Sequence, residues 1–386
     1  MEQNRLNDNR AMPTGNTLTE LPPSRDSRNA APRHETHRLR RLDGLRAVAV
    51  LMVFACHVLN TEHGWEGVTL FFVLSGFLIT GILRRARDRP DYWRSFYIKR
   101  AARILPPLVI FFALTISLYK PPLAVLPGYF CFGANIIEAF HHGPGIYFTI
   151  LWSLAVEEHF YFVWPFAVRF LSRTRLIQLS LAILVLDPLL RLIATPWFHD
   201  YIPIYMLTPF QIDGLAAGSL LALLVESDAA KSILARWSLP AFLFLAGLYI
   251  GLSSLLHSFS LTQNSAFSNS VIYTLIVLTM AALLIHTYAY PESPISRFLA
   301  SGPVFFMGSI SYGFYLFHPL AQELALRLFR LLSPVPHGLR AKALGFLIAV
   351  AISWVSFHFY EKPVLRWGRK LALEPGDPLP PALPNI

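Results

Sequence analysis

Three ionisable side chains interrupt a stretch of sequence that is otherwise apolar enough to cross a lipid bilayer. The stretch RLDGLRAVAVLMVFACH ends at His57 and contains Asp43 and Arg46. On an α-helix, steps of about 100° per residue bring Arg46 and His57 to nearly the same face, roughly 16 Å apart. Asp43 precedes Arg46 by about one turn and is expected to hold its guanidinium. Such groups inside a bilayer usually mark a cavity or a functional path; the alternative is a snorkelling arginine and a hydrogen-bonded core histidine.

A second polar group lies in LWSLAVEEHFYFVWP. Ser153, Glu157 and Tyr161 recur at every fourth residue there, so a helix would place them on one face. We interpret Glu157 as the carboxylate that faces inward and Glu158 as one that pairs outward. The spacing alone does not separate the two glutamates.

A third group lies in FMGSISYGFYLFHPL, where Ser311, Tyr315 and His318 recur at helical spacing. Pro319 has no backbone N–H, so the carbonyl of Tyr315 is freed from the helical ladder. A kinked helix with polar residues on one side suits the wall of a cavity. The alternative is that these side chains only bridge neighbouring helices.

Asp213 lies in a fourth segment, QIDGLAAGSLLA, in which Gly214 and Gly218 form a small-xxx-small packing face. Counting about 1.5 Å per residue from the ends of the predicted spans estimates the depth of each ionisable group. The estimate places four of them within several Å of one level in the outer half of the bilayer: His57, His318, Glu157 and Asp213.

The segment FYIKRAARILPP places Arg100 and Arg103 one turn apart, where the third predicted span leaves the cytoplasm. Two guanidiniums on one face at a membrane surface can clamp a phosphate. The alternative is that both only set the topology of a basic loop. Together with Arg46 and His57, they would trace a route from a cytoplasmic anionic ligand to a base inside the membrane.

The elements that must position these side chains are membrane-spanning helices. The chain has 386 residues, of which 54% are hydrophobic and only 15% charged, too apolar for an ordinary soluble protein. Apolar runs long enough for a hydrocarbon core of about 30 Å recur about ten times. They are predicted at 42–60, 66–83, 103–119, 147–168, 176–195, 204–225, 237–255, 270–289, 303–326 and 341–360. We therefore predict an all-α membrane protein, with about ten transmembrane helices in one bundle.

The basic residues predict the orientation of this bundle. Most lysines and arginines beside the spans fall on the side that also holds the N-terminus, which predicts that both termini are cytoplasmic. Residues 1–36 and the Pro-rich residues 371–386 are expected to be disordered tails on either side of a membrane domain at 37–370.

Composition also argues against two kinds of ligand. The net charge of +10 is explained by membrane topology, so no nucleic-acid partner is expected. Cys56 and Cys131 stand in no metal-ligand spacing and are interpreted as structural thiols, so no metal site is predicted.

Seven segments together resemble the acyltransferase-3 family of bacterial membrane O-acyltransferases. They are LDGLRAVAVLMVFACH, FFVLSGFLIT, FYIKRAARI, WSLAVEEHFYFVWP, IDGLAAGSLLA, SYGFYLFHPL and YEKP. One such motif would be a weak signal, but all of them stand in the family's order. The resemblance covers about residues 38–368.

The resemblance implies a ten-helix enzyme of the inner (plasma) membrane. Such an enzyme moves an acyl group, often acetyl, from cytoplasmic acyl-CoA to a hydroxyl of a cell-surface carbohydrate or glycolipid. The family's functional pairs, Arg-x10-His and Arg-x-x-Arg, correspond here to Arg46 with His57 and Arg100 with Arg103. No bound cofactor is implied, because acyl-CoA is a substrate. Neither the acceptor nor the length of the acyl chain follows from the sequence.

We expect general-base catalysis by His57. An alcohol attacks a thioester effectively only if its proton is removed as the new bond forms. Arg46, held by Asp43, would position the acyl-CoA arm or balance charge, and Glu157 would orient or tune a histidine. An acyl-histidine intermediate stays open. Four further residues are expected to bind substrate or support the site: Ser153, Asp213, Tyr315 and His318.

A proton-coupled membrane transporter of a small solute is the rival interpretation. Ionisable residues inside the bilayer and kinked spans are also typical of transporters. Arg100 and Arg103 discriminate between the two, because only an acyltransferase should need them to bind acyl-CoA.

Overall fold

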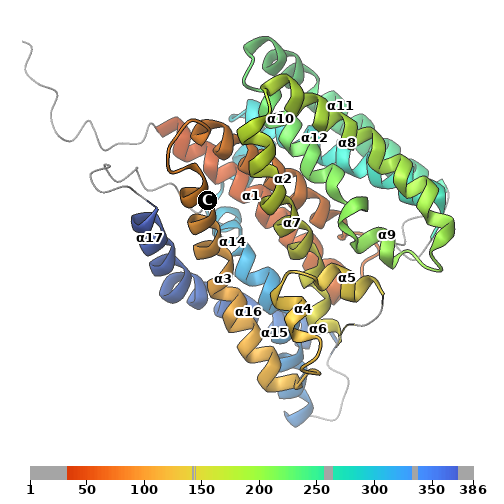
Figure 1. Cartoon of the computed structure of the whole chain (residues 1–386). Coiled ribbons are helices and arrows are strands. Elements are labelled where there is room, and N and C mark those ends of the chain that lie inside the picture. Colours follow the sequence, from red (N-terminus) through yellow and green to blue (C-terminus); the bar gives the residue numbers. More distant parts are fainter. Residues whose placement is uncertain (1–32, 141–142, 144, 256–263, 333–337, 373–386) are drawn as a thin grey trace, which may run out of the picture.

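The computed structural model of the chain describes residues 33–140, 143, 145–255, 264–332 and 338–372 (Figure 1). Every regular element in these residues is a helix, in agreement with the predicted fold class. The predicted tails, 1–36 and 371–386, lie almost entirely outside the described residues.

Nine long helices build most of the fold. They are α1 (Arg33–Phe54), α2 (Glu66–Ala86), α3 (Tyr92–Tyr119), α7 (Leu151–Phe170), α8 (Arg173–Ala194), α11 (Asp228–Leu255), α12 (Tyr273–Ala289), α15 (Ser311–Leu332) and α16 (Gly338–Val355). The shorter helices are α4 (Leu126–Phe130), α5 (Ala134–Ala139), α6 (Ile146–Thr149), α9 (Ile202–Met206), α10 (Ile212–Leu224), α13 (Pro294–Leu299), α14 (Gly302–Ser309) and α17 (Lys362–Leu371). Three π-helical turns, η2 (Ala55–Leu59), η5 (Ser268–Ile272) and η6 (Ser356–Glu361), and two 3₁₀ turns, η3 (Thr195–Trp197) and η4 (Thr208–Phe210), complete the described elements.

In the described residues, seven helical stretches are long and apolar enough to cross a membrane. They are 40–59, 66–86, 92–119, 173–197, 228–255, 268–289 and 338–368. The chain is therefore an integral membrane protein by the length and composition of its helices. The predicted number of about ten spans is not reached on this basis. The predicted spans 147–168, 204–225 and 303–326 are not among the seven, and the first of them corresponds to α7, which carries Glu157, Glu158 and His159 near its middle. The orientation of the termini stays a prediction.

The predicted continuous span at 204–225 is wrong. The structure divides this stretch into α9, η4 and the 13-residue helix α10. Pro203 and Pro209 each lie in the first turn of a new short element, where the missing N–H costs nothing. At 1.5 Å per residue, α10 is about 20 Å long, which is less than the hydrocarbon core of about 30 Å.

Two other predicted boundaries differ from the structure. The predicted span at 303–326 is divided into α14 and α15 at Ile310. The third span was predicted to begin at residue 103, but α3 begins at Tyr92 because the helix continues through the basic segment before it. Arg100 and Arg103 therefore lie on one continuous helix.

The contact between α2 and α10 depends on glycine, as the small-xxx-small pattern predicts. A Cβ atom on Gly76 would lie 2.0 Å from the carbonyl oxygen of Leu215, and one on Gly218 would lie 2.0 Å from that of Val73. Only glycine permits such a close approach of two backbones. The two helices are thereby fixed against each other.

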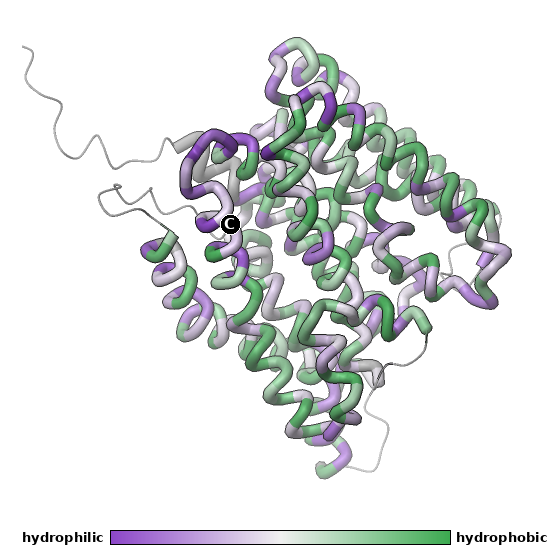
Figure 2. The backbone as a smooth tube through the Cα atoms, viewed as in Figure 1, coloured by the Kyte–Doolittle hydropathy of each residue, from purple (hydrophilic) through white to green (hydrophobic). Residues whose placement is uncertain are grey.

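The nine long helices, together with α10 and α17, form a central group with one further group on each side (Figure 1). Helices α8, α10, α11 and α12 form one side, and α3 with α15, α16 and α17 forms the other, while α1, α2 and α7 run between them. Figure 2 shows hydrophobic residues along most helices and hydrophilic residues at the turn between α2 and α3. We call this end of the bundle the arginine-rich end, because it carries Arg84, Arg85, Arg87, Arg89 and Arg94.

Contacts at the arginine-rich end fix where α3 begins. The side chain of Arg89 donates two hydrogen bonds to Asp91, at 2.8 and 3.0 Å, and these lower the pKa of Asp91. The hydroxyl of Tyr92 donates to the carbonyl of Pro165 in α7 at 2.8 Å. Helix α3, which carries Arg100 and Arg103, is thereby held against α7.

Candidate active site

A polar cavity lies where α1, α2, α3, α7 and α15 meet. Its volume is about 90 Å³, and we call it the slot. Its polar lining residues are Arg46, Ser75, Arg100, Arg103, Ser153, Glu157, Tyr161, Ser311, Tyr312 and Tyr315. The structure thus brings together residues from all three of the predicted polar helix faces and from the Arg-x-x-Arg pair.

Arg46 is anchored from its own helix. Its Nη1 atom donates to Asp43 Oδ1 at 2.6 Å, the contact that the spacing of three residues predicts. The side chain of Asp43 is 2% exposed, so this carboxylate serves Arg46 and not solvent. The ion pair fixes the guanidinium at the wall of the cavity.

Arg100 and Arg103 enter the same cavity from α3. The guanidinium of Arg100 lies over the ring of Tyr161, with its carbon 4.7 Å from the ring centroid. Arg103 lies within electrostatic range of Arg46, Arg100 and Glu361. In the described part of the chain, neither Arg100 nor Arg103 has a carboxylate within salt-bridge distance. Their donors remain available for an anionic ligand.

The two neighbouring glutamates of α7 face different surroundings. Glu157 lines the cavity and accepts a hydrogen bond of 2.5 Å from the hydroxyl of Ser75. Glu158 lines a separate, mostly apolar cavity, and its Oε1 atom is buried without a hydrogen-bond partner. Arg100 and Tyr161 border both cavities. Of the two carboxylates, only that of Glu157 belongs to the slot that holds the three arginines.

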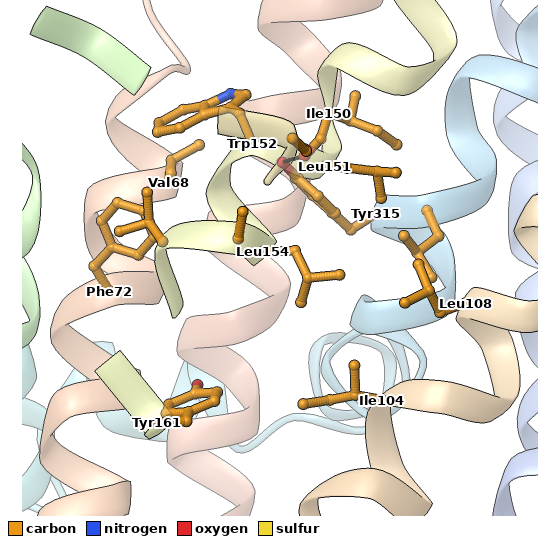
Figure 3. Packing of buried hydrophobic residues seen from close by; sticks show 14 of the residues in the cluster. Val68, Phe72, Ile104, Leu108, Ile150, Leu151, Trp152, Leu154, Tyr161 and Tyr315 are labelled. Atoms are coloured by element: carbon orange, nitrogen blue, oxygen red, sulfur yellow. Dashed lines mark hydrogen bonds between the residues drawn. The ribbon is translucent and has the colours of Figure 1, made fainter. Parts of the chain in front are cut away.

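Two hydroxyl groups of the cavity lining contact each other. The hydroxyl of Tyr315 donates to the carbonyl of Ile150 at 2.7 Å, and the hydroxyl oxygen of Ser153 lies 2.6 Å from the hydroxyl oxygen of Tyr315. In Figure 3, Tyr315 and Ile150 lie at one end of the view and Tyr161 at the other, with Leu154 between them. Tyr315 and Tyr161 therefore line different parts of the cavity.

His318 lies next to Tyr315, and His57 lies next to His318, but neither histidine lines the cavity. The Nδ1 atom of His57 is 3.0 Å from Nε2 of His318, and His318 Nδ1 is 2.8 Å from the carbonyl oxygen of Tyr315. His318 is 1% exposed, whereas His57 is exposed at the surface of the protein. The predicted arrangement, in which Arg46 and His57 face one continuous path, is therefore not the one observed.

The reason lies in the local shape of the helix that carries both residues. Helix α1 ends at Phe54, and the next five residues, 55–59, form the π-helical turn η2. A π-turn has more residues per turn than an α-helix, so the phase counted from Arg46 no longer holds at His57. Asn60 follows in the left-handed conformation, with φ at 57°, and ends the helix.

Asp213 does not join the cavity either. Its Oδ2 atom accepts a hydrogen bond of 2.7 Å from Arg191, and Arg191 Nη1 lies 3.7 Å from Asp187. Thr274 of α12 also accepts from Arg191, at 3.2 Å, so the cluster joins α8, α10 and α12. The depth estimate for Asp213 assumed one continuous span, and the break at Pro209 removes that assumption.

The sequence analysis did not identify several residues of the cavity and of the cluster around Asp213. Ser75 and Tyr312 line the cavity, and Tyr312 donates to the carbonyl of Ile104 at 3.0 Å. Ser75 could have been noticed as a polar residue inside the apolar run FFVLSGFLIT. The sequence analysis did not identify Arg191 either, although an arginine inside the predicted apolar span 176–195 indicates a buried partner.

Residues 39–358 match the model of a family described as "Acyltransferase domain". Peptidoglycan O-acetyltransferase OatA of Listeria monocytogenes is 30% identical over 359 residues, covering 85% of this chain and 56% of the relative. The putative peptidoglycan O-acetyltransferase YrhL of Bacillus subtilis is 30% identical over 369 residues, covering 85% and 55%.

O-acetyltransferase OatA of Staphylococcus aureus is 26% identical over 368 residues, covering 85% of this chain and 57% of the relative. The chain thus spans just over half the length of these relatives. No solved structure matches the chain significantly.

Proposed function

The chain belongs to the acyltransferase family defined by that domain, and on this premise we propose that it is a membrane O-acyltransferase. It would take an acyl group, acetyl in the first instance, from cytoplasmic acyl-CoA at the inner membrane. The acceptor would be a hydroxyl of a cell-envelope carbohydrate, with peptidoglycan favoured by the names of the relatives. The transporter alternative finds no support in the family match.

The observation that carries this proposal is the convergence of three guanidiniums in one slot between membrane helices. Arg46 is neutralised by Asp43, but Arg100 and Arg103 have no carboxylate within salt-bridge distance among the described residues. Unpaired cations inside a membrane protein are costly, so their retention favours an anionic ligand. The phosphates of acyl-CoA have the charge and the acceptor oxygens for such a site. The slot would suit the extended thioester arm.

The chemical step would need a base that removes the proton of the acceptor hydroxyl. His57 would take this proton while the oxygen attacks the thioester carbonyl, and the carbon–sulfur bond would break as the ester forms. The departing thiolate of CoA would then receive the proton. Because His57 lies beyond Tyr315, the thioester would have to pass that ring, whose hydroxyl is held by Ile150 and Ser153.

Binding of acetyl-CoA to the purified protein tests the proposal. A double variant, Arg100→Gln with Arg103→Gln, should bind acetyl-CoA about 100-fold more weakly, since it loses two charge-assisted contacts worth about 1.5 kcal/mol each. Isothermal titration in detergent or nanodiscs measures the change. The matched control is Arg94→Gln, an exposed arginine two turns earlier on the same helix. If the double variant binds like the control, or if the wild type binds no acetyl-CoA, the proposal is wrong.

A further inference from the structure

We infer that His318 is a positioning residue that fixes which ring nitrogen of His57 carries the proton. The arrangement leaves Nε2 of His57, on the exposed histidine, as the atom with a free lone pair. The catalytic meaning of this inference depends on the proposed function, whereas the proton arrangement itself does not.

The chain of reasoning starts at the carbonyl of Tyr315. Residue 319 is proline, so this carbonyl has no partner from the helical ladder four residues later. His318 Nδ1 lies 2.8 Å from the carbonyl oxygen of Tyr315. A carbonyl oxygen can only accept, so Nδ1 of His318 must carry a proton and donate it.

The second step concerns the other nitrogen of His318. The ring is 1% exposed and lies among Phe54, Phe314 and Tyr315, surroundings that disfavour a charged imidazolium. A neutral ring with a proton on Nδ1 has a lone pair on Nε2. The contact of 3.0 Å between His318 Nε2 and His57 Nδ1 therefore requires the proton to come from His57.

The geometry of the two rings suits this hydrogen bond. Their planes differ by only 11°, and their centroids are 5.3 Å apart. That separation is close to the largest that a contact of 3.0 Å between ring atoms permits. The rings therefore lie edge to edge in nearly one plane, so the N–H of His57 points along the lone pair of His318.

A base needs this arrangement for a chemical reason. With its proton held on Nδ1, neutral His57 presents Nε2 as an acceptor and can take a proton there. The resulting imidazolium would keep donating from Nδ1 to His318, which spreads the charge toward the Tyr315 carbonyl. In hydrolases with a serine–histidine–aspartate triad, a carboxylate performs this positioning task. A second, neutral histidine performs it without adding a buried negative charge.

Three substitutions of His318 separate positioning from mere packing. In His318→Gln, the side-chain oxygen can reach the place of Nε2 and accept from His57. His318→Asn can contact only the Tyr315 carbonyl, and His318→Leu can make neither contact. We expect acyl transfer from acetyl-CoA to fall about 10- to 100-fold in kcat for Asn and Leu, with KM for acetyl-CoA unchanged. The Gln variant should stay within about fivefold of wild type.

A second measurement does not need activity. In ¹⁵N NMR of histidine-labelled protein, the signals lost in His57→Ala identify the two ring nitrogens of His57. The wild type should show a protonated Nδ1 and an unprotonated Nε2. His318→Leu should lose this fixed pattern, and His318→Gln should keep it.

The outcomes are distinguishable. If His57→Ala is inactive while His318→Leu and His318→Asn keep the wild-type kcat, the positioning role is overturned and the proposed function stands. If His57→Ala transfers acetyl groups at the wild-type rate, the base proposed above is wrong, and the NMR pattern still decides the proton arrangement. A wild-type spectrum with the proton on Nε2 of His57 would overturn the inference directly.

Discussion

Arg191 and the pair Arg100 and Arg103 lie in different surroundings within the same bundle. Arg191 is 1% exposed and contacts two carboxylates, the carbonyl of Phe210 and a threonine hydroxyl. Arg100 and Arg103 line a cavity, and in the described residues no carboxylate pairs with either of them. The charge of Arg191 is compensated by direct ion pairs, whereas Arg100 and Arg103 make no such pair and face a cavity that they share with Glu157.

The difference separates two uses of charge inside a membrane protein. A compensated cluster ties helices together, since removing one partner leaves the others buried and unpaired. Cations that line a cavity without such ion pairs favour an anion from outside. On this view, Arg191 stabilises the fold, whereas Arg100 and Arg103 bind the ligand of the proposed function.

The largest expected effect is on folding. Arg191→Met should destabilise the protein by about 3–5 kcal/mol, because Asp213 and Asp187 would lose their shared cation. The yield of monodisperse protein and its melting temperature, measured by size-exclusion chromatography after heating, should both fall. Arg175→Met on the same helix is the exposed control and should melt like wild type. An unchanged melting temperature in Arg191→Met would contradict the claim that the ion pairs of Arg191 stabilise the fold.

A smaller effect is expected at the carboxylate of the cavity. Glu157→Gln should lower acetyl transfer about 10- to 100-fold, because it removes the negative charge next to the arginines but keeps the acceptor for Ser75. The melting temperature should stay near that of wild type. Glu158→Gln is the matched control, since its side chain lines the separate apolar cavity. Equal rates for the two variants would contradict the assignment of Glu157 to the site.

The smallest effect is expected at Ser75. Ser75→Ala removes the hydrogen bond of 2.5 Å to Glu157, and water in the slot can replace the lost donor. We expect a decrease in acetyl transfer of about three- to tenfold, with no loss of stability. The double variant, Ser75→Ala with Glu157→Gln, sharpens the test. Its rate of acetyl transfer should be no lower than that of Glu157→Gln alone. Additive losses would mean that Ser75 acts through something other than Glu157.

Residues that share one uninterrupted helix could be placed from the sequence. Ser153, Glu157 and Tyr161 line one cavity together, because α7 is continuous and spacing then fixes the face. Asp43 and Arg46 pair for the same reason. The family, the all-helical fold and a packing face at Gly214 and Gly218 could also be predicted, since they depend on motifs and small residues.

Features that depend on distant contacts could not be predicted. The turn η2 packs against the following loop, where a Cβ on Gly64 would lie 3.0 Å from the Cβ of Cys56. That contact is invisible to a count of residues along one helix. The pairing of Asp213 with Arg191 likewise depends on how α8 lies against a helix that proline has broken. Local spacing specifies a face, but only the packed structure specifies the partner.

The π-turn at residues 55–59 makes the length of this segment a functional variable. A π-turn amounts to one extra residue accommodated within an α-helix. Deleting a single residue between Phe54 and His57 would let the helix return to ordinary winding and would rotate the imidazole about the helix axis by part of one α-helical step of about 100°. The change in helix register alone would then break the hydrogen bond between His57 and His318, without a change in the chemistry of either side chain.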